Sequence, residues 1–103
     1  MLISENTDLI RALADPLRMR IVTLLARETL CTNHLMEETG ARQTNLSNHL
    51  RILREAGVVE TEPCGRFTYY RLRPEALETL SEGLSGLAAT ARSTGADQNR
   101  RPC

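Results

Sequence analysis

Hydrophobic residues recur every three or four positions in five separate stretches of this chain, which is the spacing expected of amphipathic helices. The boundary between the first two stretches is marked by Asp15, a favoured N-cap, and Pro16, a favoured first helical residue. Gly40 and Gly57 follow the third and fourth stretches, where glycine ends a helix by taking up a left-handed conformation. The pattern predicts helices at residues 5–14, 16–26, 31–39, 43–56 and 74–91.

Two shorter stretches, residues 58–62 and 67–72, have the composition of β-strands. Residues 63–66 between them include a proline and a glycine, so they predict a hairpin turn. A helix, a short turn containing glycine, a second helix and then a hairpin make up a winged helix-turn-helix. The sequence therefore predicts a mainly α fold with a small β-hairpin.

The last predicted helix carries a long apolar stripe, which is more than a small winged domain covers by itself. A helix-to-helix contact between two copies of the chain would cover it. Residues 92–103 are mostly polar, so we predict a folded domain at residues 1–91 and a disordered tail at residues 92–103. The stripe consists of Leu77, Leu80, Leu84, Leu87 and Ala91.

The helix at residues 43–56 has an unusual polar face. Leu46, Leu50 and Leu53 form its apolar side, while the opposite side carries amides, hydroxyls and one guanidinium. Asn, Ser and Thr weaken a helix, whereas an ordinary solvated face is rich in Glu and Lys. These short polar groups suit hydrogen bonding to DNA bases and phosphates, although a plain exposed helix remains the alternative. The polar face consists of Gln43, Thr44, Asn45, Ser47, Asn48 and Arg51.

The charge distribution supports a nucleic-acid surface in the middle of the chain. The net charge of the 103 residues is zero, which argues against indiscriminate binding to polyanions. Residues 42–73 nevertheless hold six arginines against three glutamates. Arg66, at the tip of the predicted hairpin, is placed to reach a minor groove or a phosphate.

The N-terminus and the cysteines indicate a cytoplasmic protein. The chain becomes polar at Ser4 and acidic at Glu5, so it lacks the pattern of a secretory signal, and no apolar run is long enough to span a membrane. Cys31, Cys64 and Cys103 are odd in number and widely spaced, which favours reduced thiols over a disulfide framework.

Four segments of the sequence resemble the ArsR/SmtB family of bacterial repressors, and the resemblance runs from about residue 7 to about residue 90. Its specific parts are an S-x-H-L-x-x-L core and a G-R-x-x-Y-Y wing. The resemblance implies a homodimeric winged helix-turn-helix transcription factor with its first and last helices at the dimer interface. Such proteins bind palindromic operators and are released by a metal ion, a metalloid or another signal. The segments are residues 12–25, 30–35, 43–59 and 64–72.

The resemblance also assigns residues to the DNA interface. His49 looks like a position that ties the recognition helix to the helix before it, and a satisfied core or interface histidine is the better interpretation. Arg42 stands where the family often has a capping serine; the lost cap would cost about 1 kcal/mol, which a phosphate contact could offset. The expected DNA contacts are Arg42, Gln43, Thr44, Asn45, Ser47, Asn48, Arg51 and Arg66.

The signal that the protein senses is harder to predict, because the family's known metal patterns are incomplete here. Arsenic-type sensors have two cysteines in the segment that corresponds to residues 30–35, and this chain keeps one. Zinc-type sensors have Asp and His ligands on the last helix, but residues 75–91 contain no His or Asp. Soft-metal sites on the N-terminal arm need a cysteine there, but the first ten residues contain no Cys. Cys31 and His34, one helical turn apart, remain as candidate ligands for nickel, zinc or cobalt, with Glu37 or Glu38 as a third. The competing interpretation is a small buried thiol and a surface histidine.

Three functional classes stay open at this point. A DNA-binding regulator of a metal or metalloid response, most simply a repressor, explains the polar helix, the basic middle third and the wing together. A second hypothesis is a winged-helix protein whose DNA binding is controlled by a separate regulatory protein, since sensor ligands are missing. An enzyme that uses Cys31 and His34 as nucleophile and base lacks an orienting third group and a pocket, so we expect no catalysis.

Overall fold

The computed structural model describes residues 2–95 and 100–103. The described residues form five helices and three short strands, which confirms the mainly α fold with a small hairpin. The elements are α1 (Leu2–Leu13), α2 (Pro16–Leu25), β1 (Leu30–Cys31), α3 (Thr32–Thr39), α4 (Gln43–Glu55), β2 (Val59–Cys64), β3 (Phe67–Leu72) and α5 (Pro74–Thr94).

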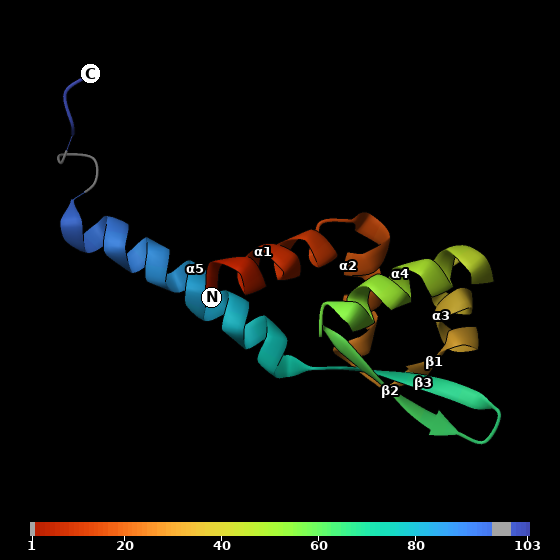
Figure 1. The fold of residues 1–103 in the computed structure, drawn as a ribbon. Helices are drawn as coiled ribbons and strands as arrows, with labels where there is room; N and C mark the ends of the chain where they lie inside the picture. Colours follow the sequence, from red (N-terminus) through yellow and green to blue (C-terminus); the bar gives the residue numbers. More distant parts are fainter. Residues whose placement is uncertain (1, 96–99) are drawn as a thin grey trace.

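The core lies where α1, α2, α3 and α4 meet the base of the hairpin (Figure 1). Each of these elements turns its apolar stripe to the same centre, as the helical spacing predicts. The most deeply buried side chains are aliphatic, which fits a chain with only three aromatic residues. They are Ile21, Leu35, Leu46, Leu50, Leu53, Val58 and Val59.

The helix boundaries follow local capping chemistry. Asp15 caps α2 through its side chain, which accepts a hydrogen bond of 3.0 Å from the backbone N–H of Arg18, and Pro16 opens the helix. Gly40 ends α3 with a φ of +74°, a left-handed conformation that glycine adopts without steric cost. Both predicted boundaries are therefore confirmed. The connection from α3 to α4 is short, as a helix-turn-helix requires.

The sheet contains one more strand than the sequence predicted. Its order is β1-β3-β2 and both pairings are antiparallel. Leu30 and Cys31 pair with Tyr70 and Tyr69, so Cys31 closes a strand instead of opening the third helix as predicted. A two-residue strand has no readable alternation, and its partner lies about forty residues away, which is why local spacing missed it.

The hairpin turn is also tighter than expected. β2 continues through Pro63 and Cys64, which pair with Thr68 and Phe67, so the turn is left to Gly65 and Arg66. Gly65 has a φ of +63°, which suits a two-residue hairpin loop. Proline is tolerated in β2 because this strand lies at the edge of the sheet.

Helix α5 projects away from the rest of the molecule (Figure 1). Its first half packs on α1, which approaches closely at Gly83: a Cβ there would meet the Asn6 amide. Leu80 is buried, whereas Leu84 is 51% exposed and Leu87 70% exposed.

The helix reaches Thr94 and so overlaps the start of the predicted tail at residue 92; residues 96–99 of that tail lie outside the described residues. Within the described part of the chain, no helix has both the length and the apolar character needed to cross a membrane.

Candidate nucleic-acid interface

The two sides of α4 differ sharply in burial. Leu46, Leu50 and Leu53 are at most 1% exposed and fix the helix to the core. All eight residues predicted to contact DNA are exposed, and none of their side chains has a hydrogen bond or ion pair within the described part of the chain. The structure brings seven of them together along α4 and its N-cap and places the eighth in the hairpin turn. They are Arg42, Gln43, Thr44, Asn45, Ser47, Asn48, Arg51 and Arg66.

The N-terminus of α4 lacks a side-chain cap. Arg42 occupies the N-cap position in an extended conformation, with no capping hydrogen bond from its side chain, and the first turn holds no acidic residue. The first backbone N–H groups of a helix have no partner within the helix and carry partial positive charge. This end of α4 therefore presents donors that suit a phosphate.

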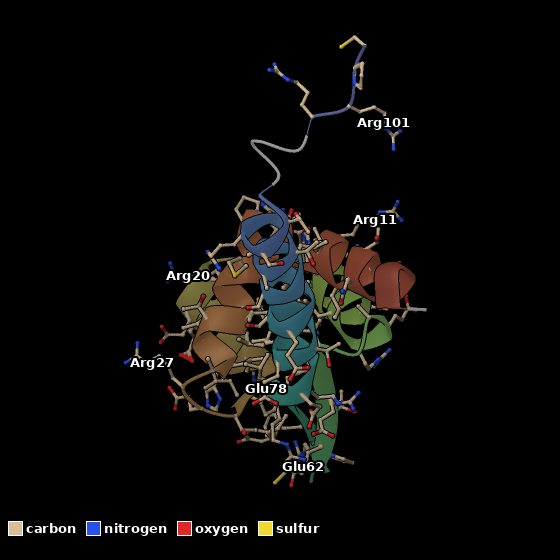
Figure 2. All side chains as sticks on the ribbon, turned by 90° about the vertical axis from the view of Figure 1, so that its left-hand side faces the viewer. Arg11, Arg20, Arg27, Glu62, Glu78 and Arg101 are labelled. Atoms are coloured by element: carbon tan, nitrogen blue, oxygen red, sulfur yellow. The ribbon has the colours of Figure 1, made fainter. Side chains whose placement is uncertain are left out.

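The wing carries two arginines in different electrostatic settings. Arg71 of β3 is paired with Glu60 at 3.4 Å and with Glu62 at 3.2 Å, both on β2. Arg66 in the turn has no such pair among the described residues. Glu62 lies toward the outer end of the hairpin (Figure 2). The positive charge that the wing can offer to a polyanion is thus concentrated at Arg66.

His49 links α4 to the start of α2 and not to α3, the preceding helix, as the resemblance implied. Its Nδ1 lies 3.0 Å from Nη1 of Arg18 and 3.7 Å from Oδ2 of Asp15. The side chain is 19% exposed, which confirms the interpretation of a satisfied interface histidine. The role of Arg18 was missed, because its partner is 31 positions away and no local spacing joins them.

The pKa of the Asp15 carboxyl is lowered in this cluster. The backbone N–H of Arg18, which donates to the carboxylate, lowers the pKa of Asp15 below its ordinary value, and the positive charge of Arg18 acts in the same direction. The carboxylate therefore stays ionised at neutral pH and remains the N-cap of α2.

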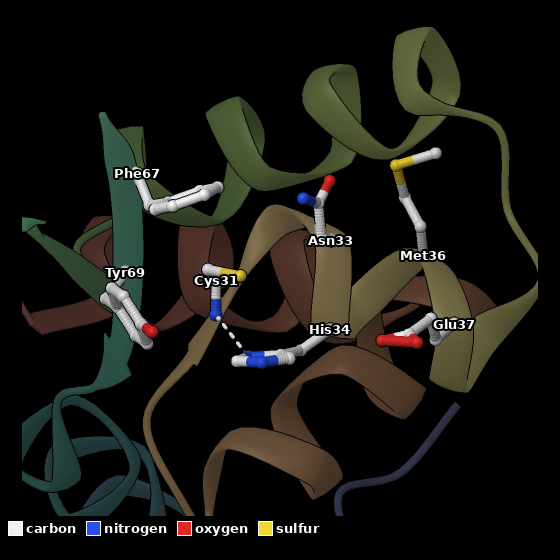
Figure 3. Close-up of a pocket in the computed structure, with 7 residues that line it drawn as sticks. All are labelled: Cys31, Asn33, His34, Met36, Glu37, Phe67 and Tyr69. Carbon is white, nitrogen blue, oxygen red and sulfur yellow. Dashed lines mark hydrogen bonds between the residues drawn. The ribbon is translucent and has the colours of Figure 1, made fainter. Parts of the chain in front are cut away.

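Cys31 and His34 lie together, but their geometry is that of a helix cap. The backbone N–H of Cys31 donates to Nδ1 of His34 at 3.2 Å, and the imidazole contacts the edge of Tyr69 with ring centres 6.0 Å apart (Figure 3). The Cys31 thiol is buried. Both residues border an open cavity of about 580 Å³, whose lining comes from β1, α3 and β3. The lining residues are Cys31, Asn33, His34, Met36, Glu37, Phe67 and Tyr69.

This arrangement does not fit a metal ion well. Because Nδ1 accepts a hydrogen bond, the ring proton of the neutral imidazole sits on Nε2, so neither nitrogen offers a free lone pair. Among the described residues, no group of three or more His, Cys, Asp or Glu side chains could hold an ion. The acceptor on His34 also faces a backbone N–H and not the Cys31 thiol, so the pair lacks the contact expected of a nucleophile and its base.

Comparison with known proteins identifies the family. Residues 15–61 match the model of the bacterial regulatory proteins of the arsR family. The chain is 38% identical over 78 residues to the arsenic resistance transcriptional regulator ArsR1 of Pseudomonas putida, covering 75% of this chain and 61% of that protein. It is 34% identical over 81 residues to the biofilm growth-associated repressor of Agrobacterium fabrum, covering 79% and 69%.

Solved structures support the same family assignment. The crystal structure of a possible transcriptional regulator for arsenical resistance superposes with a TM-score of 0.72 at 32% identity, covering 91% of this chain and 98% of that one. An ArsR-like transcriptional regulator from Rhodococcus superposes with a TM-score of 0.84 at 25% identity, covering 92% and 90%. The chain spans 61% of the length of the Pseudomonas regulator and 48% of that of the SmtB repressor of Mycobacterium tuberculosis. By sequence and by fold, the chain belongs to the ArsR family of bacterial regulatory proteins.

Proposed function

We propose that this protein is a transcriptional repressor that binds palindromic operator DNA as a homodimer in the cytoplasm, and that it is not an enzyme. The observation that carries the proposal is the exposed polar face of α4, whose side chains have no partner in the described chain, on a helix whose apolar side is fully buried. The relatives named as repressors support the same function.

The proposed contacts divide by chemistry. Amide side chains such as Asn45 and Asn48 suit the paired donor and acceptor of adenine in the major groove. Arg42, Arg51 and Arg66 suit phosphates or guanine, and the uncapped N-terminus of α4 offers further donors to a phosphate. Gln43, Thr44 and Ser47 complete the proposed reading face.

The homodimer is proposed from α1 and α5. Leu84 and Leu87 leave an apolar stripe uncovered along the projecting half of α5. Exposed leucines gain from being covered by other apolar side chains, so a second copy that packs on this part of α5 would account for them. Its two α4 helices would enter major grooves about 34–36 Å apart.

The test is fluorescence anisotropy with the duplex that the wild-type protein selects from a random-sequence library. We expect Asn45→Ala and Arg51→Ala each to weaken binding by about tenfold or more, and Arg51→Ala to lower the salt dependence by about one phosphate contact. Arg27, which projects outward just beyond the end of α2, is the matched control for loss of one positive charge (Figure 2). Full affinity in both α4 variants would refute the assignment of α4 as the recognition helix.

A metal response through Cys31 and His34 stays a prediction. The name of the Pseudomonas relative supports an arsenic response in that protein, whereas the capping role of His34 in this chain counts against its use as a ligand. Nickel, zinc, cobalt and arsenite should be titrated into the protein–DNA complex, with the Cys31→Ala, His34→Ala double variant as control. If no ion changes the affinity of the wild-type protein, the signal comes from another molecule, such as a second regulatory protein.

A further inference from the structure

One arginine joins three helices of this molecule. The guanidinium of Arg18, on α2, donates from Nε to the carbonyl of Ala12 at 2.7 Å and from Nη2 to the carbonyl of Arg11 at 3.2 Å, both at the end of α1. Its remaining nitrogen, Nη1, lies 3.0 Å from Nδ1 of His49 on α4. Its backbone N–H meanwhile donates to Asp15, the N-cap of α2.

These contacts are well suited to hold helices at fixed relative positions. The last carbonyls of a helix have no hydrogen-bond partner within the helix and favour a nearby cation. The end of α1 therefore binds the guanidinium of Arg18 favourably. The guanidinium is a rigid fork, and its three contacts therefore leave α4 little freedom to rotate relative to α1. Beside this link runs an open groove between α1 and α4 of about 280 Å³, so the two helices are not locked by apolar packing along their whole length.

The link uses Nδ1 of His49 as its acceptor. Arginine has only donors, so Nδ1 must accept from Nη1 of Arg18 and the ring carries its proton on Nε2. The Asp15 carboxylate lies 3.7 Å from the same nitrogen.

We propose that Arg18 is a positioning residue that sets the orientation of α4 relative to α1 through its contact with Nδ1 of His49, and that DNA binding depends on this link. The inference rests on the proposed function of α4. If α1 belongs to the dimer interface, the link also fixes the distance between the two α4 helices of the dimer. That distance must match the spacing of the two half-sites of an operator.

The test measures operator affinity by anisotropy, with the duplex selected by the wild-type protein, for Arg18→Met, His49→Gln and the double variant. We expect Arg18→Met to weaken binding by about tenfold, the scale of one charge-assisted hydrogen bond. Its salt dependence should match that of the wild type, because Arg18 is not a phosphate contact. His49→Gln should weaken binding less, because glutamine keeps an acceptor for Arg18. The double variant should bind about as well as Arg18→Met, because without Arg18 there is no link for the change at His49 to weaken.

Two substitutions at His49 separate positioning from a general structural role. His49→Ala removes the acceptor for Arg18, whereas His49→Gln keeps one, so His49→Ala should weaken binding more than His49→Gln. Circular dichroism and sedimentation show that the proteins compared are folded and equally associated; if Arg18→Met fails to fold, the comparison of His49→Ala with His49→Gln decides alone.

Equal affinities of His49→Ala and His49→Gln, or additive losses in the double variant, would overturn this inference alone. Wild-type binding no stronger than that of Asn45→Ala would overturn the proposed function, and this inference with it.

Discussion

Helices α4 and α5 both expose one long face, and the two faces are chemically opposite. α4 buries its leucines and shows amides, hydroxyls and guanidinium groups to solvent. α5 buries Leu80 but leaves Leu84 and Leu87 at least half exposed along its projecting part. The polar face costs helix stability and the apolar face costs solubility, so neither is explained by the folding of a single chain.

The difference indicates two different partners. Short polar groups gain little from covering a protein surface but can pair with base edges, whereas exposed leucines gain from being covered by other apolar side chains and have nothing to offer to DNA. Under the proposed function, one small domain would separate recognition of DNA from self-association by placing them on different helices. Three experiments test this division.

The largest effect should come from charging the apolar face of α5. Leu84→Asp combined with Leu87→Asp should abolish self-association and weaken operator binding by about a thousandfold, because two half-sites would no longer be bound by one linked molecule. Sedimentation velocity and anisotropy measure the two effects. Ser85→Asp combined with Ala89→Asp adds the same charge to the opposite side of α5 and is the matched control; an equal loss in that variant would contradict the assignment.

A smaller effect separates the two faces of α4. Leu50→Ala leaves a cavity in the core and should lower the free energy of unfolding by about 3 kcal/mol. Ile52 is 36% exposed on the same helix, so Ile52→Ala should cost less than about 1 kcal/mol. Urea denaturation of both variants provides the comparison, and similar costs would mean that α4 is not anchored by one side.

The smallest effect concerns the start of α4. Arg42→Ser supplies the missing capping oxygen and should raise the free energy of unfolding by about 1 kcal/mol. If Arg42 contacts a phosphate, the same variant should bind DNA more weakly although it is more stable. Thermal unfolding and anisotropy on one preparation settle both points; a variant that gains stability and keeps full affinity would argue against the phosphate contact.

Most of the fold could be predicted because it depends on residues that are close together in the sequence. The leucine spacing of α4, the cap at Asp15 and the glycine after α3 each depend on residues within one or two turns, and the structure confirms them. The polar face of α4 could be recognised in the same way, because its residue types and spacing are both visible in the sequence.

What could not be predicted depends on distant pairing or on the direction of a hydrogen bond. β1 exists because it meets β3, and the link from His49 to Arg18 joins α4 to α2 across 31 positions of the sequence. Cys31 and His34 were correctly expected to lie one turn apart. Which ring nitrogen of His34 accepts the hydrogen bond, however, depends on the orientation of the ring, and residue spacing does not reveal that orientation.

The composition of β2 has a consequence for how the protein behaves at high concentration. β2 is an edge strand, and an unprotected edge invites the strands of another molecule to pair with it. Glu60 and Glu62 place negative charge along it, and Pro63 removes one hydrogen-bond donor. Strand-to-strand aggregation through the hairpin is thereby discouraged, and the surface of the wing stays accessible for the proposed contact with DNA.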